Sequence, residues 1–319
     1  MRGLLLASGT MSLCDDLPLP TARKGWSRVR VLQAGICATD QALDRGYMGF
    51  CGVPGHEFVG IALDGPLAGK RVTGEINAGC GTCELCRNHD SRHCKHRTVL
   101  GILQHSGAFA EQLSLPNENL VHVPDSVSDS AATFVEPLAA ALHIADDVDL
   151  ARHKRALVAG DGKLGLLCAH ALALHGCNVT IAGRHPERLP LLPRGATLVS
   201  GWLEASAPKD VLPFDLAVDA TGNSDVLPRL LALVRPRGTI VIKTTTERPT
   251  SICWSSLVVN EQRLIGSRCG RFAPAIAALA NGSVPVERWI AARYPLAQAL
   301  QAFQHAGTKG TLKVLLQIS

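Results

Sequence analysis

Residues 155–165 read Arg-Ala-Leu-Val-Ala-Gly-Asp-Gly-Lys-Leu-Gly, and this stretch decides the fold. A short apolar run ends in a G-x-G-x-x-G turn formed by Gly160, Gly162 and Gly165, and a segment with helical periodicity follows. A second apolar run, residues 178–182, comes directly afterwards. Strand, glycine turn, helix and strand in this order predict a right-handed βαβ unit in a parallel sheet.

The three glycines of the turn have separate predicted roles. Gly160 permits the tight turn, Gly162 lets the backbone approach a pyrophosphate, and Gly165 lets the helix and strand pack closely. The N-terminus of the following helix presents positive charge to a phosphate group. We therefore predict a dinucleotide-binding site, with Lys163 and Leu164 at the start of the helix as part of it.

The end of the second strand predicts which dinucleotide binds. An acidic residue about twenty positions after the glycines would hold the ribose 2′-hydroxyl of NAD. Residues 182–185 read Ala-Gly-Arg-His and contain no carboxylate. Gly183 leaves room for a 2′-phosphate that the guanidinium of Arg184 could bind, which favours NADP(H) over NAD(H). His185 and Arg188 are predicted to belong to the same cofactor-binding segment. The alternative for Arg184 is that it is only a solvated residue at the end of the strand.

The rest of the chain predicts a second, β-rich region before this unit. Short apolar and β-branched runs, such as residues 29–32 and 108–113, are separated by Gly and Pro, which is typical of a barrel-like domain. The Ala-rich periodicity of residues 130–146 predicts a helix. Further strands of the parallel sheet are expected at residues 216–219 and 239–242.

Composition excludes several classes of protein. The 319 residues carry a net charge of +5, but Lys and Arg are scattered and aromatic residues make up only 4%, which argues against nucleic-acid binding. No apolar run approaches the roughly 20 residues of a membrane helix. Residues 1–7 predict a strand rather than a signal peptide. Eleven cysteines, partly in metal-ligand spacing, favour a reducing cytoplasm.

The cysteines that stand in metal-ligand spacing form a C-x2-C-x2-C-x7-C run, made by Cys80, Cys83, Cys86 and Cys94. Four thiolates can surround one tetrahedral zinc ion without an open position, so this predicts a structural zinc lobe over residues 78–97. The run by itself is equally compatible with a nucleic-acid zinc module.

A second metal site is predicted from residues elsewhere in the chain. Cys37 and His56 supply one thiolate and one imidazole, and a third protein ligand would leave the fourth position of a zinc ion open for substrate, as catalysis requires. Glu136 is the predicted third ligand, and Glu57 is the alternative. With the cysteine run, two zinc ions per chain are expected.

These motifs together resemble a known family. In chain order they are Gly-Ile-Cys-Ala-Thr-Asp (35–40), Gly-His-Glu (55–57), the four cysteines, Gly-Ala-Phe-Ala-Glu (107–111), Glu-Pro-Leu-Ala (136–139) and the glycine turn. The pattern is similar to the zinc-dependent alcohol dehydrogenases of the medium-chain dehydrogenase/reductase superfamily, over essentially the whole chain. The Glu-Pro-Leu form resembles the polyol, glucose and threonine dehydrogenase branches.

The resemblance implies an α/β architecture in three segments. Residues 1–136 would form a GroES-like β-barrel catalytic domain that carries the structural zinc lobe. Residues 137–268 would form a Rossmann NAD(P)-binding domain, and residues 269–319 would return to the catalytic domain. Relatives are commonly dimers or tetramers, so a homo-oligomer is expected.

The resemblance also implies roles for individual residues. Cys37, His56 and Glu136 would hold the catalytic zinc, with Glu57 beside it. Asp40 would hydrogen-bond the free ring nitrogen of the histidine.

Further residues would serve the proton and the cofactor. Thr39 would pass the alcohol proton outward, although Ala42 stands where many relatives continue the relay with a histidine. Thr221, Gly222 and Arg268 would line the nicotinamide side.

The predicted activity is hydride transfer between NADP(H) and an alcohol and ketone or aldehyde pair, with zinc polarising the oxygen of this small-molecule substrate. An NAD-dependent polyol or amino-alcohol dehydrogenase of the same family is the nearest alternative. A non-catalytic zinc- or nucleotide-binding protein and a zinc-free quinone reductase are more distant alternatives.

Overall fold

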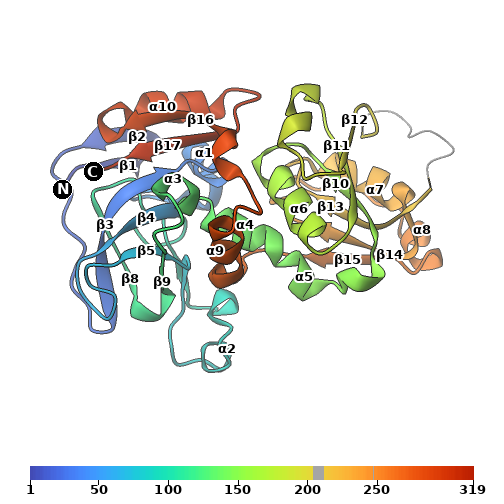
Figure 1. Cartoon of the computed structure of the whole chain (residues 1–319). Helices are drawn as coiled ribbons and strands as arrows, with labels where there is room; N and C mark the ends of the chain where they lie inside the picture. The colour runs from blue at the N-terminus through green and yellow to red at the C-terminus, as the bar shows by residue number, and fades with distance from the viewer. Residues whose placement is uncertain (204–211, 247) are drawn as a thin grey trace. The chain divides into compact units, whose positions relative to one another are not determined.

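The computed structural model describes residues 1–203, 212–246 and 248–319. The chain divides into two compact units (Figure 1). Unit 1 comprises Met1–Glu136 and Arg271–Ser319, and unit 2 comprises Pro137–Gly270. Among the described residues, no helix is both long and apolar enough to cross a membrane.

Unit 1 is built on a seven-stranded sheet with the order β16-β17-β3-β4-β5-β9, in which β8 pairs with β3. Its neighbouring strands are antiparallel except β16 and β17, which are parallel. Its strands are β3 (Trp26–Gly35), β4 (Glu57–Ala62), β5 (Arg71–Gly74), β8 (Gln112–Pro116), β9 (Leu120–His122), β16 (Ile290–Pro295) and β17 (Lys313–Gln317). Two smaller pairs are β1 (Gly3–Ala7) with β2 (Thr10–Cys14), and β6 (Asn77–Ala78) with β7 (Thr98–Val99).

Strand β3 shows why this region forms an antiparallel sheet. Val29 and Val31 are buried, while Arg30 between them is exposed, so one face packs on the core and the other meets water. The strand expected at residues 108–113 starts later, because β8 begins at Gln112. The preceding residues are buried in a loop, where the carbonyl of Phe109 accepts the Leu4 N–H at 2.7 Å.

The single helix expected over residues 130–146 is wrong, since three short helices occupy this range: α3 (Asp129–Ala132), α4 (Val135–Leu142) and α5 (Ile144–Asp147). Pro137 lacks an N–H, so a helix through this segment loses the hydrogen bond to Thr133. The Thr133 hydroxyl, at the end of α3, donates to the Ser130 carbonyl at 2.8 Å. Of the three helices, α3 lies in unit 1, α4 crosses the boundary between the units, and α5 lies in unit 2. Unit 1 also contains α1 (Ala38–Asp44), α2 (Glu84–Arg87), α9 (Phe272–Ala280) and α10 (Ala299–Gly307).

Unit 2 contains a six-stranded parallel sheet with the order β12-β11-β10-β13-β14-β15. Counted from β10, this order is 3-2-1-4-5-6, the doubly wound Rossmann arrangement. The strands are β10 (Arg155–Ala159), β11 (Asn178–Ala182), β12 (Thr197–Val199), β13 (Phe214–Asp219), β14 (Val234–Ile242) and β15 (Arg263–Gly266). The predicted α/β class and the predicted parallel strands are confirmed.

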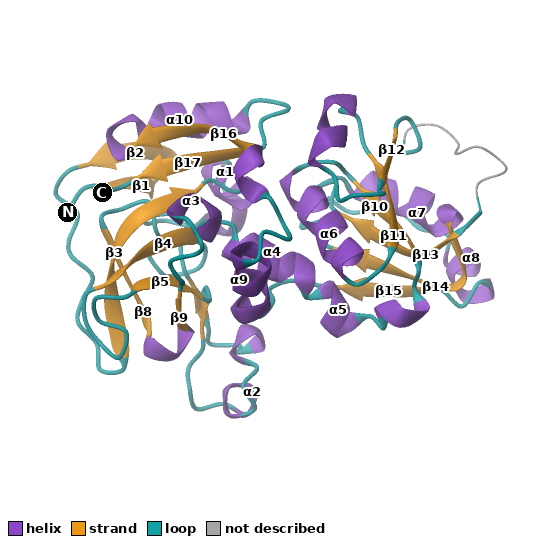
Figure 2. Cartoon of the chain, viewed as in Figure 1, coloured by secondary structure: helices purple, strands orange, loops and turns teal. Residues whose placement is uncertain are grey.

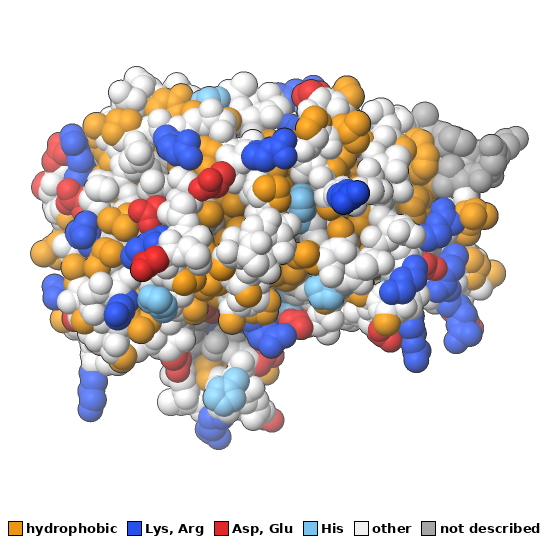
Figure 3. Space-filling model, in the orientation of Figure 1, with side chains coloured by type: hydrophobic (Ala, Val, Ile, Leu, Met, Phe, Trp, Pro, Cys, Tyr) orange, Lys and Arg blue, Asp and Glu red, His pale blue; other side chains and the backbone are white. Residues whose placement is uncertain are grey.

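The interior of unit 2 explains why its strands read as continuous apolar runs. Residues 156–159 of β10 are all buried, because helices cover both faces of a parallel sheet. Figure 2 shows these strands side by side among the helices α6 (Lys163–Leu174), α7 (Leu227–Leu233) and α8 (Trp254–Val259). In α6, residues 165–172 are buried throughout. Figure 3 shows Lys and Arg side chains scattered over the visible face rather than gathered in one stripe.

Candidate functional site

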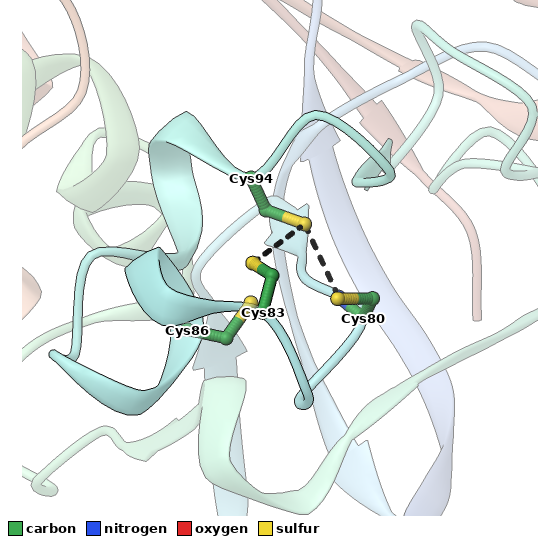
Figure 4. A group of neighbouring side chains, drawn as sticks. All are labelled: Cys80, Cys83, Cys86 and Cys94. Atoms are coloured by element: carbon green, nitrogen blue, oxygen red, sulfur yellow. Dashed lines mark hydrogen bonds between the residues drawn. The ribbon is translucent and has the colours of Figure 1, made fainter.

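The four predicted zinc-binding cysteines lie together in one loop region of unit 1 (Figure 4). Their Sγ atoms are all within 4.8 Å of one another. The Sγ of Cys94 is the buried centre of the group: it lies 3.7 Å from the Sγ of Cys83 and accepts the Cys80 N–H at 3.5 Å. Hydrogen bonds from Thr82 lower the pKa of Cys80 to about 5, which favours the thiolate. Four soft donors in this arrangement fit one closed tetrahedral zinc ion.

A second group of potential ligands consists of Cys37, His56 and Glu57, whose ligand atoms also lie within 4.8 Å of one another. Cys37 caps the N-terminus of α1 just after β3, and His56 immediately precedes β4. Antiparallel pairing of the two strands places Gly35 opposite Glu57, so the two loops meet. A Cβ at Gly35 would stand 2.7 Å from the Glu57 carboxylate, and glycine keeps this space open.

Asp40 orients the first two of these residues. Its side chain accepts the Cys37 N–H at 2.8 Å, and its other carboxylate oxygen lies 3.2 Å from Nδ1 of His56. Burial works to lower the pKa of His56, but the charge and hydrogen bonding of Asp40 raise it well above its usual value. A proton held on Nδ1 leaves Nε2 available for a cation. The hydroxyl of Thr39 is 3.9 Å from the Sγ of Cys37.

Glu57 is held from its far side by a lysine near the end of the chain. Lys313 is 1% exposed, and its Nζ donates to Oε2 of Glu57 in a fully buried ion pair. The same Nζ lies 4.8 Å from the ring centroid of Phe134. Sequence analysis missed this role of Lys313, because nothing in an apolar C-terminal strand indicates which buried residue it meets.

Glu136 was predicted as the third zinc ligand, but it is not in either group of ligand atoms within 4.8 Å among the described residues. In the structure, Glu57 is the carboxylate that groups with Cys37 and His56. Glu136 nevertheless belongs to the same charged environment. Burial, helped by the negative charges of Glu57 and Glu75, raises the pKa of Glu136 to about 7, against the positive charges of His56 and Lys313. Its charge is therefore only partly compensated by the protein.

The glycine turn in unit 2 has the geometry that its sequence predicts. Gly160 follows β10 with φ +97°, a conformation that side chains disfavour. A Cβ at Gly165 would stand 1.9 Å from the Gly160 carbonyl oxygen, so α6 approaches the turn too closely for any other residue. Gly162 caps α6, and no atom lies within 4 Å of where its Cβ would be. Lys163 and Leu164 open the helix and are half-buried.

The other predicted cofactor residues follow the carboxyl ends of neighbouring strands of the same sheet, where ligands bind in this fold. Thr221 comes after β13 and donates its hydroxyl to Asp219 at 2.7 Å, and the Gly222 N–H donates to Thr244 at 3.0 Å. Arg268 comes after β15, and its carbonyl accepts from the buried Lys243 at 3.2 Å.

One residue of this site was not predicted. Asp161, the second residue of the glycine turn, is 5% exposed, and its carboxylate contacts the segment that contains Arg184, His185 and Arg188. A Cβ at Gly183 would stand 2.4 Å from this carboxylate. The structure thus gives Gly183 a different role from the one expected: it makes room for an aspartate.

Comparisons with known proteins agree with this architecture. Residues 23–125 match the alcohol dehydrogenase GroES-like domain. An L-threonine 3-dehydrogenase from Chelativorans sp. (strain BNC1) is 30% identical over 83% of both chains. This chain belongs to the zinc-dependent alcohol dehydrogenase family of the medium-chain dehydrogenase/reductase superfamily.

Two solved structures extend the agreement over the full length. An alcohol dehydrogenase from Escherichia coli CFT073 in complex with NADH superimposes with a TM-score of 0.90 at 25% identity, covering 100% of this chain and 99% of that one. A protein from Sinorhizobium meliloti 1021 bound to NADP gives a TM-score of 0.88 at 25% identity, covering 99% of both chains. The predicted family and fold are confirmed, and the chain is an NAD(P)-dependent alcohol dehydrogenase.

Replacing Lys313 by Met should destabilise the dehydrogenase by about 3–5 kcal/mol, because the buried carboxylate of Glu57 loses its counter-charge. The double variant Lys313→Met, Glu57→Gln should recover most of that free energy, since no unpaired charge remains. Denaturant unfolding measures both. Arg28→Met, which breaks the half-exposed pair with Asp64, is the control and should cost about 1 kcal/mol or less. A single Lys313 variant as stable as this control would contradict the role of the pair.

Two alanine substitutions in the glycine turn should distinguish its role in helix packing from its role in dinucleotide binding. Gly165→Ala should destabilise unit 2 by about 1–3 kcal/mol or more, because the methyl group meets the Gly160 carbonyl. Gly162→Ala should leave the unfolding free energy within about 0.5 kcal/mol but weaken dinucleotide binding, since its methyl group obstructs the approach of the pyrophosphate. Unfolding curves and cofactor titrations test this; equal loss of stability in both variants would show it to be wrong.

Proposed function

We propose that this dehydrogenase uses a zinc ion held by Cys37, His56 and Glu136 to interconvert a small secondary alcohol and its ketone with NADP(H). Glu57 lies within reach as an exchanging carboxylate. Bound zinc would supply a Lewis acid for the substrate oxygen, and the nicotinamide would supply the hydride acceptor or donor.

The observation that carries the proposal is the partly uncompensated charge of Glu136 beside the Cys37 and His56 donors. Its pKa of about 7 means that a positive charge in its surroundings would be strongly favourable. Glu57, by contrast, is already paired with Lys313. A divalent cation shared by one thiolate, one imidazole and Glu136 would leave the Glu57–Lys313 pair intact.

The protein side chains around this group have separate tasks in the proposed reaction. Asp40 holds the proton on Nδ1 of His56 and so keeps Nε2 directed at the cation. The Thr39 hydroxyl, close to Cys37, is placed to take the alcohol proton and pass it outward. Lys313 holds the carboxylate of Glu57 in a buried ion pair.

For the cofactor, the proposal rests on the segment after β11. Residues 182–185 include Arg184, whose side chain is exposed, and contain no acidic residue that could hold a ribose 2′-hydroxyl. A guanidinium binds a phosphate through two parallel hydrogen bonds, so NADP(H) is the proposed cofactor. The NADH complex of the Escherichia coli structure keeps NAD(H) as the second candidate.

The proposed substrate class is a polyol or amino alcohol. The Glu-Pro-Leu sequence at residues 136–138 supports it, as does the similarity to an L-threonine 3-dehydrogenase. A spectrophotometric screen of sugars, polyols, amino alcohols and simple ketones with NADPH and NADP⁺ would identify the substrate.

Removing the carboxylate of Glu136 should abolish one zinc site and the activity. Glu136→Gln should lower kcat/KM by about 100-fold or more and reduce zinc from two ions per chain to one, since the four-cysteine site does not depend on it. Metal analysis and steady-state kinetics measure the two effects. The control is Glu75→Gln, which alters a neighbouring carboxylate and should retain both ions. Unchanged turnover in Glu136→Gln would refute the assignment.

The cofactor assignment predicts that turnover with NADPH exceeds turnover with NADH. Arg184→Gln should lower kcat/KM for NADPH by about tenfold and leave the value for NADH within about twofold, because only the 2′-phosphate contact is lost. Initial rates at limiting concentrations of each cofactor measure the two kcat/KM values. A wild-type enzyme that prefers NADH would favour the second candidate.

A further inference from the structure

The aspartate inside the glycine turn makes an unusually complete set of contacts. Oδ2 of Asp161 accepts the backbone N–H of Arg184 at 3.0 Å and that of His185 at 2.8 Å. Oδ1 lies 3.0 Å from Nδ1 of His185 and accepts from a guanidinium nitrogen of Arg188 at 3.3 Å. The same nitrogen of Arg188 donates to the backbone carbonyl of Asp161 at 2.6 Å. One carboxylate therefore joins the turn after β10 to the whole segment after β11.

The carboxylate of Asp161 restricts which residue can stand at position 183. Residue 183 has to be glycine, because any Cβ there would stand 2.4 Å from the Asp161 carboxylate. The position where many dinucleotide-binding proteins carry an acidic side chain on the second strand is thus filled by an acidic side chain from the turn. Asp161 in the turn therefore requires glycine at position 183, after the strand.

The contacts show that this carboxylate is not a free acceptor for a ribose hydroxyl. Its two oxygens already meet two backbone N–H groups, an imidazole and a guanidinium, and the residue is 5% exposed. Burial alone would raise the pKa of Asp161, but the hydrogen bonds of His185 and the charge of Arg188 lower it below its usual value. The group stays ionised and is directed inward, toward the segment.

The charges outside the carboxylate are arranged differently. Arg188 is 6% exposed and its charge is balanced by Asp161. Arg184 gives only its backbone N–H to the aspartate; its side chain is exposed and, among the described residues, has no partner. Residues 183–185 therefore present the charge of Arg184 to solvent on a backbone that Asp161 holds in place.

We propose that Asp161 is the positioning residue for 2′-phosphate recognition: it fixes the backbone of residues 184–185, so that only the side chain of Arg184 has to be ordered when the phosphate binds. This rests on the proposed NADP(H) preference and adds a residue to it. A group held in the bound geometry before binding loses less conformational freedom on binding, which increases affinity.

The test compares the binding of 2′,5′-ADP and 5′-AMP, which differ only in the 2′-phosphate, by calorimetric titration of the zinc-loaded enzyme without bound dinucleotide. Wild type should bind 2′,5′-ADP more tightly. Asp161→Asn, which keeps the shape but cannot accept all four donors, should reduce that preference by about tenfold and change 5′-AMP affinity by about twofold or less. Asp215→Asn is the matched control, because Asp215 holds the Arg155 N–H and the Arg235 side chain near the amino ends of the strands of the same sheet. It should leave the preference unchanged.

A double variant distinguishes positioning from a general structural role. If Asp161 acts through Arg184, then Asp161→Asn in an Arg184→Gln background should cause no further loss of the preference. Additive losses, equal weakening of both ligands, or tighter binding of 2′,5′-ADP in Asp161→Asn would each overturn the proposal. A wild type without preference for 2′,5′-ADP would overturn the NADP(H) assignment as well. A wild type that prefers 2′,5′-ADP, with the preference unchanged in Asp161→Asn, would overturn only the role of the aspartate.

Discussion

The buried ion pair between Lys313 and Glu57 connects the last strand of the chain to the candidate catalytic centre. Its two side chains are 2% and 1% exposed, so each charge depends on the other for compensation. β17 pairs with β3, which in turn pairs with β4, and this places the lysine beside the glutamate across 256 positions of sequence. The C-terminal strand β17 therefore contributes a charged residue, Lys313, to the site.

Glu136 is the other buried carboxylate near this pair, and its burial raises its pKa. A buried acid whose pKa rises to about 7 is costly for the protein to keep ionised, and a cation removes that cost. Cys37 and His56 approach from the loops before α1 and β4, held by Asp40. Asp40 therefore faces His56, Glu57 faces Lys313, and Glu136 is the carboxylate of this region whose pKa burial raises.

Unit 2 also compensates a buried charge, in this case the negative charge of Asp161. A negative side chain in a phosphate-binding turn would repel the ligand if its charge were free, and here Asp161 is surrounded by donors. The aspartate neutralises Arg188 and orders the backbone at Arg184. The negative charge of Asp161 is therefore compensated by the donors of the segment after β11.

Sequence alone determined much of this protein: the βαβ unit at residues 155–182, the four-cysteine group, and the juxtaposition of Cys37 with His56. These features depend on local periodicity, close spacing or several motifs occurring together, all of which are visible along one chain. Only the tertiary structure decided which carboxylate groups with Cys37 and His56, that Lys313 pairs with Glu57, and that Asp161 occupies the space beside Gly183. Those outcomes depend on strand register and on burial, which set distances and charge compensation between residues far apart in sequence. The break of residues 130–146 into three helices also depended on side-chain contacts and one proline that the helical periodicity did not reveal.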